Sequence, residues 1–371
     1  MQTELELNEM ILEITNKIRE RDPELLNHLH ESPITIPYAE NPAVAVLTLG
    51  SYYDSLALIL QNHENDEAKT LIVKEVENLP VTEIVTMELN NSYQNLLTEI
   101  AHFVISYNDT GAGIVPIIFL HGFPFDKSMW KGQLDALKFS NRVIACDIRG
   151  FGKSTGEKTP LSIDLFGEDL VAFMDKLNLD KAIVCGLSMG GYIALNAIKS
   201  YPERFEALIL CDTQCIADTK EVKENRLKVI DQIKLDGANE FNEKFIKSVF
   251  HPDSLEHKTE LVENLRSTVF ANSKEIIIAG LTALAERTET CSILDSIKIP
   301  TLIICGREDS VTPLAQSKYM HKHIKGSILK IINNAGHVSN LEQPDEFNSY
   351  IEDFLNSLNP VPDKGDLDLA L

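Results

Sequence analysis

The sequence predicts an α/β protein with a mostly parallel sheet, helices on both faces of the sheet and a helical cap. From about residue 96, short continuous apolar runs alternate with helical stretches, which is typical of parallel strands that are buried on both faces. Residues 218–287 interrupt this alternation, because they are rich in Lys, Glu and Leu at helical spacing and contain no clear strand. About four helices are expected there, inserted between two strands as a cap over one end of the sheet.

The expected strands account for the sheet in chain order. They are residues 100–107, 114–120, 142–146, 182–185, 207–211, 300–305 and 327–332. Residues 96–357 are therefore predicted to form one domain, and residues 358–371, with two prolines and several acids, are predicted to form a flexible tail.

A small all-α segment is predicted ahead of this domain. Residues 1–65 read as helical, with Leu7, Met10, Ile11, Ile14 and Ile18 on one helix face. Residues 1–80 hold 15 acidic and 5 basic side chains, a charge of -10, which indicates a separate acidic unit of unknown role. Residues 66–95 are predicted to be a linker.

Composition and charge exclude some classes of partner. The chain has 34 Lys and Arg against 56 Asp and Glu, and its formal net charge of -22 repels nucleic acid and anionic membranes. No run of 18 apolar residues is present, and residues 1–13 lack the basic start and apolar core of a signal peptide. We therefore expect a cytoplasmic protein without nucleic-acid or membrane partners, for which self-association stays open.

The cysteines show no metal-ligand spacing, so no metal site is expected. The six are Cys146, Cys185, Cys211, Cys215, Cys291 and Cys305, and three of them lie inside apolar strand-like runs. Buried free thiols in a reducing cytosol are the simplest explanation.

The strongest chemical signal is the run Gly186-Leu187-Ser188-Met189-Gly190, which matches the G-x-S-x-G nucleophile elbow. Both glycines are needed because the serine occupies a sharp strand-to-helix turn, where a side chain two positions away would collide with neighbouring backbone. An apolar run precedes the motif and a helical stretch follows it, as an elbow requires. The sequence thus predicts Ser188 as a nucleophile.

A serine nucleophile needs a base and an acid that orients the base. His337 lies in a loop directly after the last predicted strand, and Asp309 lies in the loop after the preceding one. The resulting order of Ser, Asp and His is that of α/β-hydrolases. Glu308 and Asp212 remain alternatives for the acid.

The oxyanion of the reaction needs preorganised donors. One is expected to be the backbone N–H of Met189, directly after the nucleophile. The other is expected from Phe123, in the loop His121-Gly122-Phe123-Pro124 after an early strand, where the glycine allows close approach of the backbone. His121 is expected to have a structural role.

Together these residues resemble the α/β-hydrolase superfamily, in particular its capped carboxylesterase and enol-lactonase branch. The resemblance covers about residues 96–357. It rests on the Phe123 loop, the segment Asp147 to Ser154, the Ser188 elbow, the Asp309 loop and Gly336-His337 with Glu342 and Pro344 following. It implies that Ser188, Asp309 and His337 form the triad and that the Asp147 to Ser154 loop supports the elbow.

The function expected from this resemblance is hydrolysis of a small-molecule carboxylic ester or lactone through an acyl-enzyme, with no cofactor. A dehalogenase-like member would carry Asp at position 188. The alternatives are a cofactor-free perhydrolase or haloperoxidase with the same triad, and a non-catalytic small-molecule-binding protein of this fold. The cap phenylalanines Phe241, Phe245, Phe250 and Phe270 are candidates for pocket residues, although core packing also explains their helical spacing.

Overall fold

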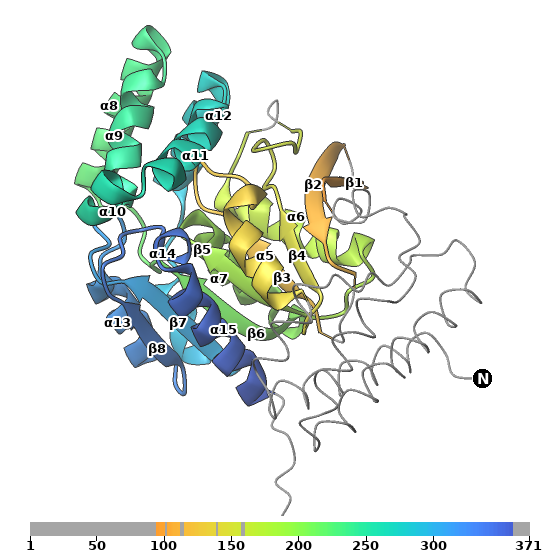
Figure 1. Ribbon diagram of the computed structural model, residues 1–371. Helices are drawn as coiled ribbons and strands as arrows, with labels where there is room; N and C mark the ends of the chain where they lie inside the picture. Colours follow the sequence, from red (N-terminus) through yellow and green to blue (C-terminus); the bar gives the residue numbers. More distant parts are fainter. Residues whose placement is uncertain (1–93, 101, 112–114, 139, 157–159, 359–371) are drawn as a thin grey trace, which may run out of the picture. The chain divides into compact units, whose positions relative to one another are not determined.

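The computed structural model describes residues 94–358, with the exception of residues 101, 112–114, 139 and 157–159 (Figure 1). The chain divides into two units between Tyr93 and Gln94, and all described residues belong to the second unit. The predicted helical segment of residues 1–65, the predicted linker up to residue 93 and the predicted tail from residue 359 lie outside the described residues.

An eight-stranded sheet forms the centre of the described region, in the order β1-β2-β4-β3-β5-β6-β7-β8. All neighbouring strands from β4 to β8 in this order are parallel, so the predicted mostly parallel sheet is confirmed. Because the carboxyl ends of these strands meet at one edge, the loops that follow them lie close together. The parallel strands are β3 (Ile117–Leu120), β4 (Val143–Cys146), β5 (Ala182–Leu187), β6 (Phe205–Cys211), β7 (Thr301–Gly306) and β8 (Ile328–Ile332).

The other end of the sheet is an antiparallel hairpin that the sequence did not predict. β1 (Leu96–Ile100) pairs with β2 (Phe103–Asp109), and β2 pairs antiparallel with β4. We expected a single strand over residues 100–107. The side chains of β1 alternate between partly buried and exposed, as on the edge of a sheet, so β1 lacks the continuous apolar run that marks the other strands.

Helices cover both faces of the sheet. Alternate side chains of β3 enter two different apolar clusters, with Ile118 and Leu120 in one and Ile117 and Phe119 in the other. α6 (Ile163–Lys176) and α7 (Met189–Ser200) contribute to the first cluster, and α5 (Lys131–Leu137) and α15 (Pro344–Leu358) to the second. The remaining elements of the domain are α13 (Leu314–His323), α14 (Ser339–Glu342) and the 3-10 helices η2 (Lys127–Trp130), η3 (Pro202–Arg204) and η4 (Cys291–Ser296).

The predicted cap is present between β6 and β7 (Figure 1). It contains five helices, one more than expected, because the six-residue α10 is too short to produce a periodic pattern. Taken singly, no described helix is long and apolar enough to cross a membrane; α11 and α12 meet that test only as a pair, with a 93° bend between them. The cap helices are α8 (Lys220–Asp236), α9 (Asn239–Val249), α10 (Pro252–His257), α11 (Thr259–Phe270) and α12 (Lys274–Glu286).

A disulfide bond joins the two ends of the cap. Cys215 lies after β6 and Cys291 begins η4, and their sulfur atoms are bonded across a sequence separation of 76 residues. The N–H of Thr290 also donates to the carbonyl oxygen of Cys215 over 2.8 Å. The prediction that all six cysteines are free thiols is therefore wrong for this pair. The other four, Cys146, Cys185, Cys211 and Cys305, are free and buried.

Candidate active site

Ser188 occupies the turn between β5 and α7, at φ 54° and ψ -114°. A positive φ is uncommon for a residue other than glycine and costs about 1–3 kcal/mol, so the surrounding structure must hold it. A Cβ atom on Gly186 would come within 2.3 Å of the Gly190 backbone, and one on Gly190 within 2.2 Å of the Leu120 carbonyl oxygen. Both glycines of the motif are thus required by backbone contacts on either side of the serine.

The end of β6 holds the backbone of Ser188 in place. The N–H of Ser188 donates to the Cys211 carbonyl oxygen over 3.0 Å, and the hydroxyl of Thr213 donates to the Ser188 carbonyl oxygen over 2.8 Å. The side chain of Ser188 therefore extends from a fixed turn at the first residue before α7. The positive end of the α7 dipole lies at this turn and favours negative charge there.

His337 and Asp309 form a buried pair. Nδ1 of His337 lies 2.9 Å from Oδ2 of Asp309, and both side chains are almost fully excluded from solvent. The N–H groups of Val311 and Thr312 donate to Oδ1 of Asp309 over 2.8 and 2.9 Å, and the Thr312 hydroxyl donates to Oδ2 over 2.7 Å. The structure therefore brings together two of the three residues that the sequence predicted as a triad.

The pKa values of this pair shift in opposite directions. Burial alone would raise the pKa of Asp309, but the charge and hydrogen bond of His337 and the Thr312 donors outweigh burial and lower it. Burial alone would lower the pKa of His337, but the charge and hydrogen bond of Asp309 outweigh burial and raise it above 6.5. Asp309 is therefore an ionised partner that holds a proton on Nδ1 of His337 and leaves Nε2 free to accept one.

The described side chains show no hydrogen bond between Ser188 and His337. Catalytic contacts between a nucleophile and its base are often long without substrate and tighten when substrate binds. The geometry around Ser188 therefore rests on the elbow, and the geometry around His337 rests on its pairing with Asp309.

The two alternative acids differ in their surroundings. Glu308 is exposed, and its Oε2 accepts only from the N–H of Ala335, over 3.3 Å. Asp212 is fully buried at the end of β6; its Oδ1 accepts from the N–H of Gly306 over 2.7 Å and its Oδ2 from the Ser339 hydroxyl over 2.5 Å. Neither carboxylate bonds to His337, so neither occupies the position of Asp309.

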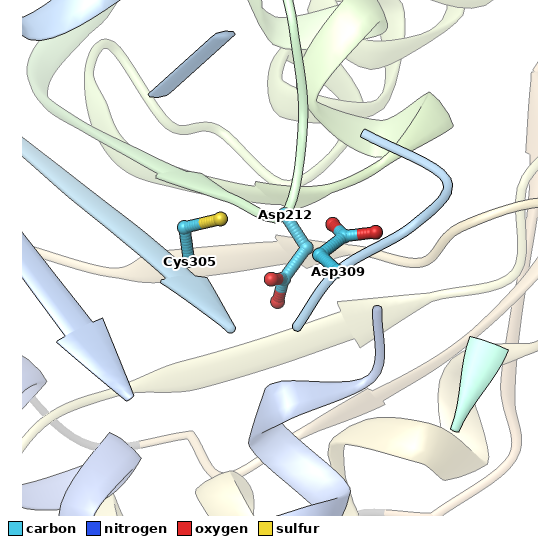
Figure 2. A group of neighbouring side chains, drawn as sticks. All are labelled: Asp212, Cys305 and Asp309. Atoms are coloured by element: carbon cyan, nitrogen blue, oxygen red, sulfur yellow. The ribbon is translucent and has the colours of Figure 1, made fainter. Parts of the chain in front are cut away.

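Asp212 and Asp309 nevertheless lie next to each other, together with Cys305 (Figure 2). Burial, reinforced by the negative charge of Asp309, raises the pKa of Asp212 to about 8. The ligand atoms of these three residues lie within 4.8 Å of one another, a spacing that metal sites share. All of these atoms already bond to protein groups, with the Cys305 thiol donating to the Gly306 carbonyl oxygen, so a metal ion would have to displace those bonds.

Two backbone N–H groups near the elbow have no protein acceptor. Phe123 and Met189 are buried, and in the described part of the chain neither N–H donates a hydrogen bond. Met189 is the first residue of α7, where helix geometry leaves the N–H without an intrahelical partner. A buried N–H without an acceptor is costly, which makes this pair of donors suited to an oxygen atom of a bound molecule.

His121 is occupied by backbone groups on both ring nitrogens. Its Nδ1 lies 2.9 Å from the Gly122 carbonyl oxygen, and its Nε2 accepts from the N–H of Ile148 over 2.9 Å. Burial also lowers its pKa, so the ring is neutral. His121 thus connects the loop after β3, which contains Phe123, to the loop after β4.

The loop after β4 is organised around the buried carboxylate of Asp147. Asp147 accepts from the N–H of Lys127 and from the N–H of Lys153, each over 2.8 Å, and pairs with the Lys127 ammonium at 2.7 Å. This loop and η2 are therefore fixed to each other beside the loop that holds Phe123.

Two residues of the site were not singled out from the sequence as functional. Thr312 donates to Asp309 and lies 3.3 Å from Nδ1 of His337. The buried Glu342 accepts from the N–H of Gly336 over 2.6 Å and from the N–H of His251 over 2.7 Å, which ties the His337 loop to the start of α10. The quoted segments contained both, but the sequence gave no sign of which groups they would contact.

The family model described as alpha/beta hydrolase fold matches residues 115–344, which contain the elbow, Asp309 and His337. The chain belongs to the α/β-hydrolase fold family. This match excludes the antiparallel hairpin β1–β2, so the hairpin is an addition at the edge of the matched region.

Relatives within the family include hydrolases. The chain is 31% identical over 243 residues to the 3-oxoadipate enol-lactonase 2 of Acinetobacter baylyi, covering 66% of this chain and 89% of the relative. It is 32% identical over 273 residues to a putative non-heme chloroperoxidase of a Synechocystis species, covering 68% and 94%. Among solved structures, a thermophilic esterase from Thermogutta terrifontis superposes with a TM-score of 0.68 at 30% identity, covering 71% of this chain and 99% of the esterase. These α/β-hydrolase relatives support a hydrolase acting on a small molecule.

Proposed function

We propose that this α/β-hydrolase cleaves a carboxylic ester or lactone of a small molecule through an acyl-enzyme on Ser188. His337 is the general base, Asp309 orients and charges it, and the N–H groups of Phe123 and Met189 form the oxyanion hole. The similarity to an enol-lactonase and to an esterase supports this class of substrate.

The observation that carries the proposal is the backbone of Ser188 at positive φ between β5 and α7. Strain of this kind persists where the fold over-determines it, and it is characteristic of functional sites. Here it directs a buried hydroxyl to the carboxyl edge of the sheet, where the buried pair of Asp309 and His337 also lies.

In the acylation step, the Ser188 oxygen attacks the carbonyl carbon while Nε2 of His337 takes the serine proton. The two N–H donors stabilise the oxyanion, and Asp309 stabilises the imidazolium. Collapse of the tetrahedral intermediate expels the alcohol or enol oxygen, which takes the proton from His337. In a lactone this oxygen stays attached to the acyl group.

In the deacylation step, water repeats the same sequence on the acyl-serine and releases the acid. Hydrogen peroxide in place of water would release a peracid and regenerate Ser188, which is the perhydrolase alternative. The similarity to a putative chloroperoxidase keeps that alternative in consideration. The rate of ester loss in water, compared with peracid formation from acetate and hydrogen peroxide, separates the two functions.

The proposal is tested by replacing Ser188 with alanine. We expect Ser188→Ala to fold and to lose about 10⁴-fold or more in the hydrolysis of p-nitrophenyl esters, because triad members act as a unit. A fluorophosphonate probe should label the parent protein at Ser188 alone. The matched control is Ser200→Ala at the exposed far end of α7, which should retain parental activity and labelling. Unchanged turnover in Ser188→Ala would refute the proposal, and a parent without any labelling or turnover would favour a non-catalytic binding protein.

A further inference from the structure

Aromatic side chains connect the cap to the loop that carries the proposed oxyanion donor. Phe241 and Phe245 are four residues apart on α9, and their rings stack with centroids 5.9 Å apart. The Phe123 ring lies 6.3 Å from that of Phe241 and 6.2 Å from that of Phe245, and the Phe125 ring lies 5.8 Å from that of Phe245. We call these four side chains the aromatic wall.

The aromatic wall is close to the nucleophile. A Cβ atom on Gly122 would lie 3.2 Å from the Phe125 ring and 3.2 Å from Cβ of Ser188, so the ring and the serine lie on either side of one glycine. Phe123 belongs to the wall through its ring and to the proposed oxyanion hole through its N–H. An acyl group bound at Ser188 is therefore within reach of these rings.

The two cap phenylalanines differ from the core residues of the same helix. Ile246 and Val249 are fully buried, whereas Phe241 and Phe245 are only partly buried, although rings surround them. Phe123 and Phe125, on the other side of the wall, are buried. Part of the apolar surface of Phe241 and Phe245 is thus left uncovered by the described protein, which core packing alone does not explain.

The charges near the domain core offer nothing to a substrate carboxylate. Within the described part of the chain, the buried cationic side chains are Lys127 and Arg287. Lys127 pairs with Asp147 at 2.7 Å, and Arg287 pairs with Asp218 at 2.7 Å, both with buried carboxylates. A second carboxylate that entered this region would lose its hydration without gaining a cation, which is unfavourable by several kcal/mol.

We propose that Phe241 and Phe245 form the acyl-binding side of the active site and select esters or lactones with an uncharged, apolar or aromatic acyl group. This inference rests on the proposed function and assigns its substrate class. The rings provide apolar area and favourable edge or face contacts to an aromatic acyl group. A carboxylate at the end of the acyl chain finds only the same rings.

The test compares three p-nitrophenyl esters that share a leaving group. In the parent protein, we expect kcat/KM for the phenylacetate ester to exceed that for the acetate ester by about tenfold or more, since apolar contacts discriminate at this level. The succinate monoester, which ends in a carboxylate, should not exceed the acetate ester. A succinate monoester that is the best of the three would overturn the inference.

Variants then assign the selectivity to the wall. Phe245→Ala should lower the ratio of phenylacetate to acetate turnover by about tenfold, and Phe241→Ala should lower it in the same direction. Phe270→Ala is the matched control, because Phe270 is a partly buried cap phenylalanine whose ring contacts Arg266 instead. It should leave the ratio unchanged.

The ratio separates specificity from general damage. A variant whose oxyanion loop has moved loses both activities together and keeps the ratio, and such a result for Phe241→Ala and Phe245→Ala would overturn the inference. If Phe245→Ala does not fold, Phe245→Leu gives the same readout, since it removes the ring and keeps most of the volume. Absence of turnover on all three esters would instead count against the proposed function itself.

Discussion

The loops after β6 and β7 each place a buried carboxylate at the same edge of the sheet, yet the two carboxylates behave differently. Asp309, after β7, receives two N–H groups, a hydroxyl and an imidazole, and its pKa is lowered. Asp212, after β6, receives one N–H and one hydroxyl, and its pKa is raised to about 8. Both residues are buried, so burial does not decide which one is ionised.

The difference teaches that the number of donors and the presence of the imidazole set the charge at this edge. One ionised carboxylate supports His337, and a second one beside it would repel the first. At neutral pH the edge therefore carries the charge of Asp309 together with a protonated Asp212. The protonated carboxyl can donate to or accept from the Ser339 hydroxyl, so it holds the loop of α14 without adding charge.

The largest effect is expected when the ionised member is replaced. Asp309→Asn should lower kcat for ester hydrolysis by about 10⁴-fold, because an amide no longer favours the His337 tautomer that accepts the serine proton. The parent should gain activity as the pH rises through the raised pKa of His337, above 6.5, since only the neutral ring can act as base. Without the Asp309 charge, the residual activity of the variant should rise at lower pH than that of the parent.

A pH series of kcat on both proteins measures these effects. The assignment of Asp309 would have to be abandoned if Asp309→Asn retained parental turnover or if its profile stayed at the parental pH.

A smaller effect, in stability rather than in rate, is expected for Asp212. Its folded pKa of about 8 lies above the value of about 3.9 for an unfolded Asp, so between these values only the folded state keeps the proton. The free energy of unfolding of the parent should therefore decrease as pH rises over this window, by up to about 1.4 kcal/mol per pH unit from this group. Asp212→Asn cannot titrate and should lose this contribution to the slope, with kcat within about tenfold of the parent because it keeps the triad.

Urea unfolding of both proteins at pH 5, 6, 7 and 8 gives the two slopes. Parallel slopes would show that Asp212 is ionised in the folded protein, and a loss of activity as large as that of Asp309→Asn would make Asp212 the acid.

The smallest effect is expected for the exposed neighbour of Asp309. Glu308 accepts only from the N–H of Ala335, over 3.3 Å, and Gln at this position keeps an acceptor oxygen. Glu308→Gln should leave kcat/KM for p-nitrophenyl acetate within about twofold of the parent, since the exposed charge is screened by solvent. A loss comparable to that of Asp309→Asn would move the acid to Glu308.

The parts of this molecule that depend on local sequence could be predicted. The elbow around Ser188 is encoded by glycines two residues away on each side, and the buried parallel strands are continuous apolar runs. The β1–β2 hairpin lacked such a run because its edge strand alternates. The short α10 offered too few residues for a period.

Features that depend on distant contacts could not be predicted. Cys215 and Cys291 are 76 residues apart and had no paired spacing to suggest a bond. The sequence left both Asp212 and Asp309 as candidate acids, because the groups that distinguish them, such as Thr312 and Ser339, act through side chains whose direction only the fold sets. For the same reason the sequence alone could not separate pocket from core among the cap phenylalanines.

The Cys215–Cys291 bond makes the whole cap part of a covalent ring that begins after β6 and ends at η4. A peptide bond cut anywhere inside this ring leaves both fragments in one molecule, so a protease could open the cap without detaching it. The ring also limits how far the two ends can separate when the chain unfolds, which for a ring of this size is worth about 4 kcal/mol in a chain-entropy description. The sheet and its most divergent insertion therefore stay tethered even when the helices between the two sulfur atoms have lost their structure.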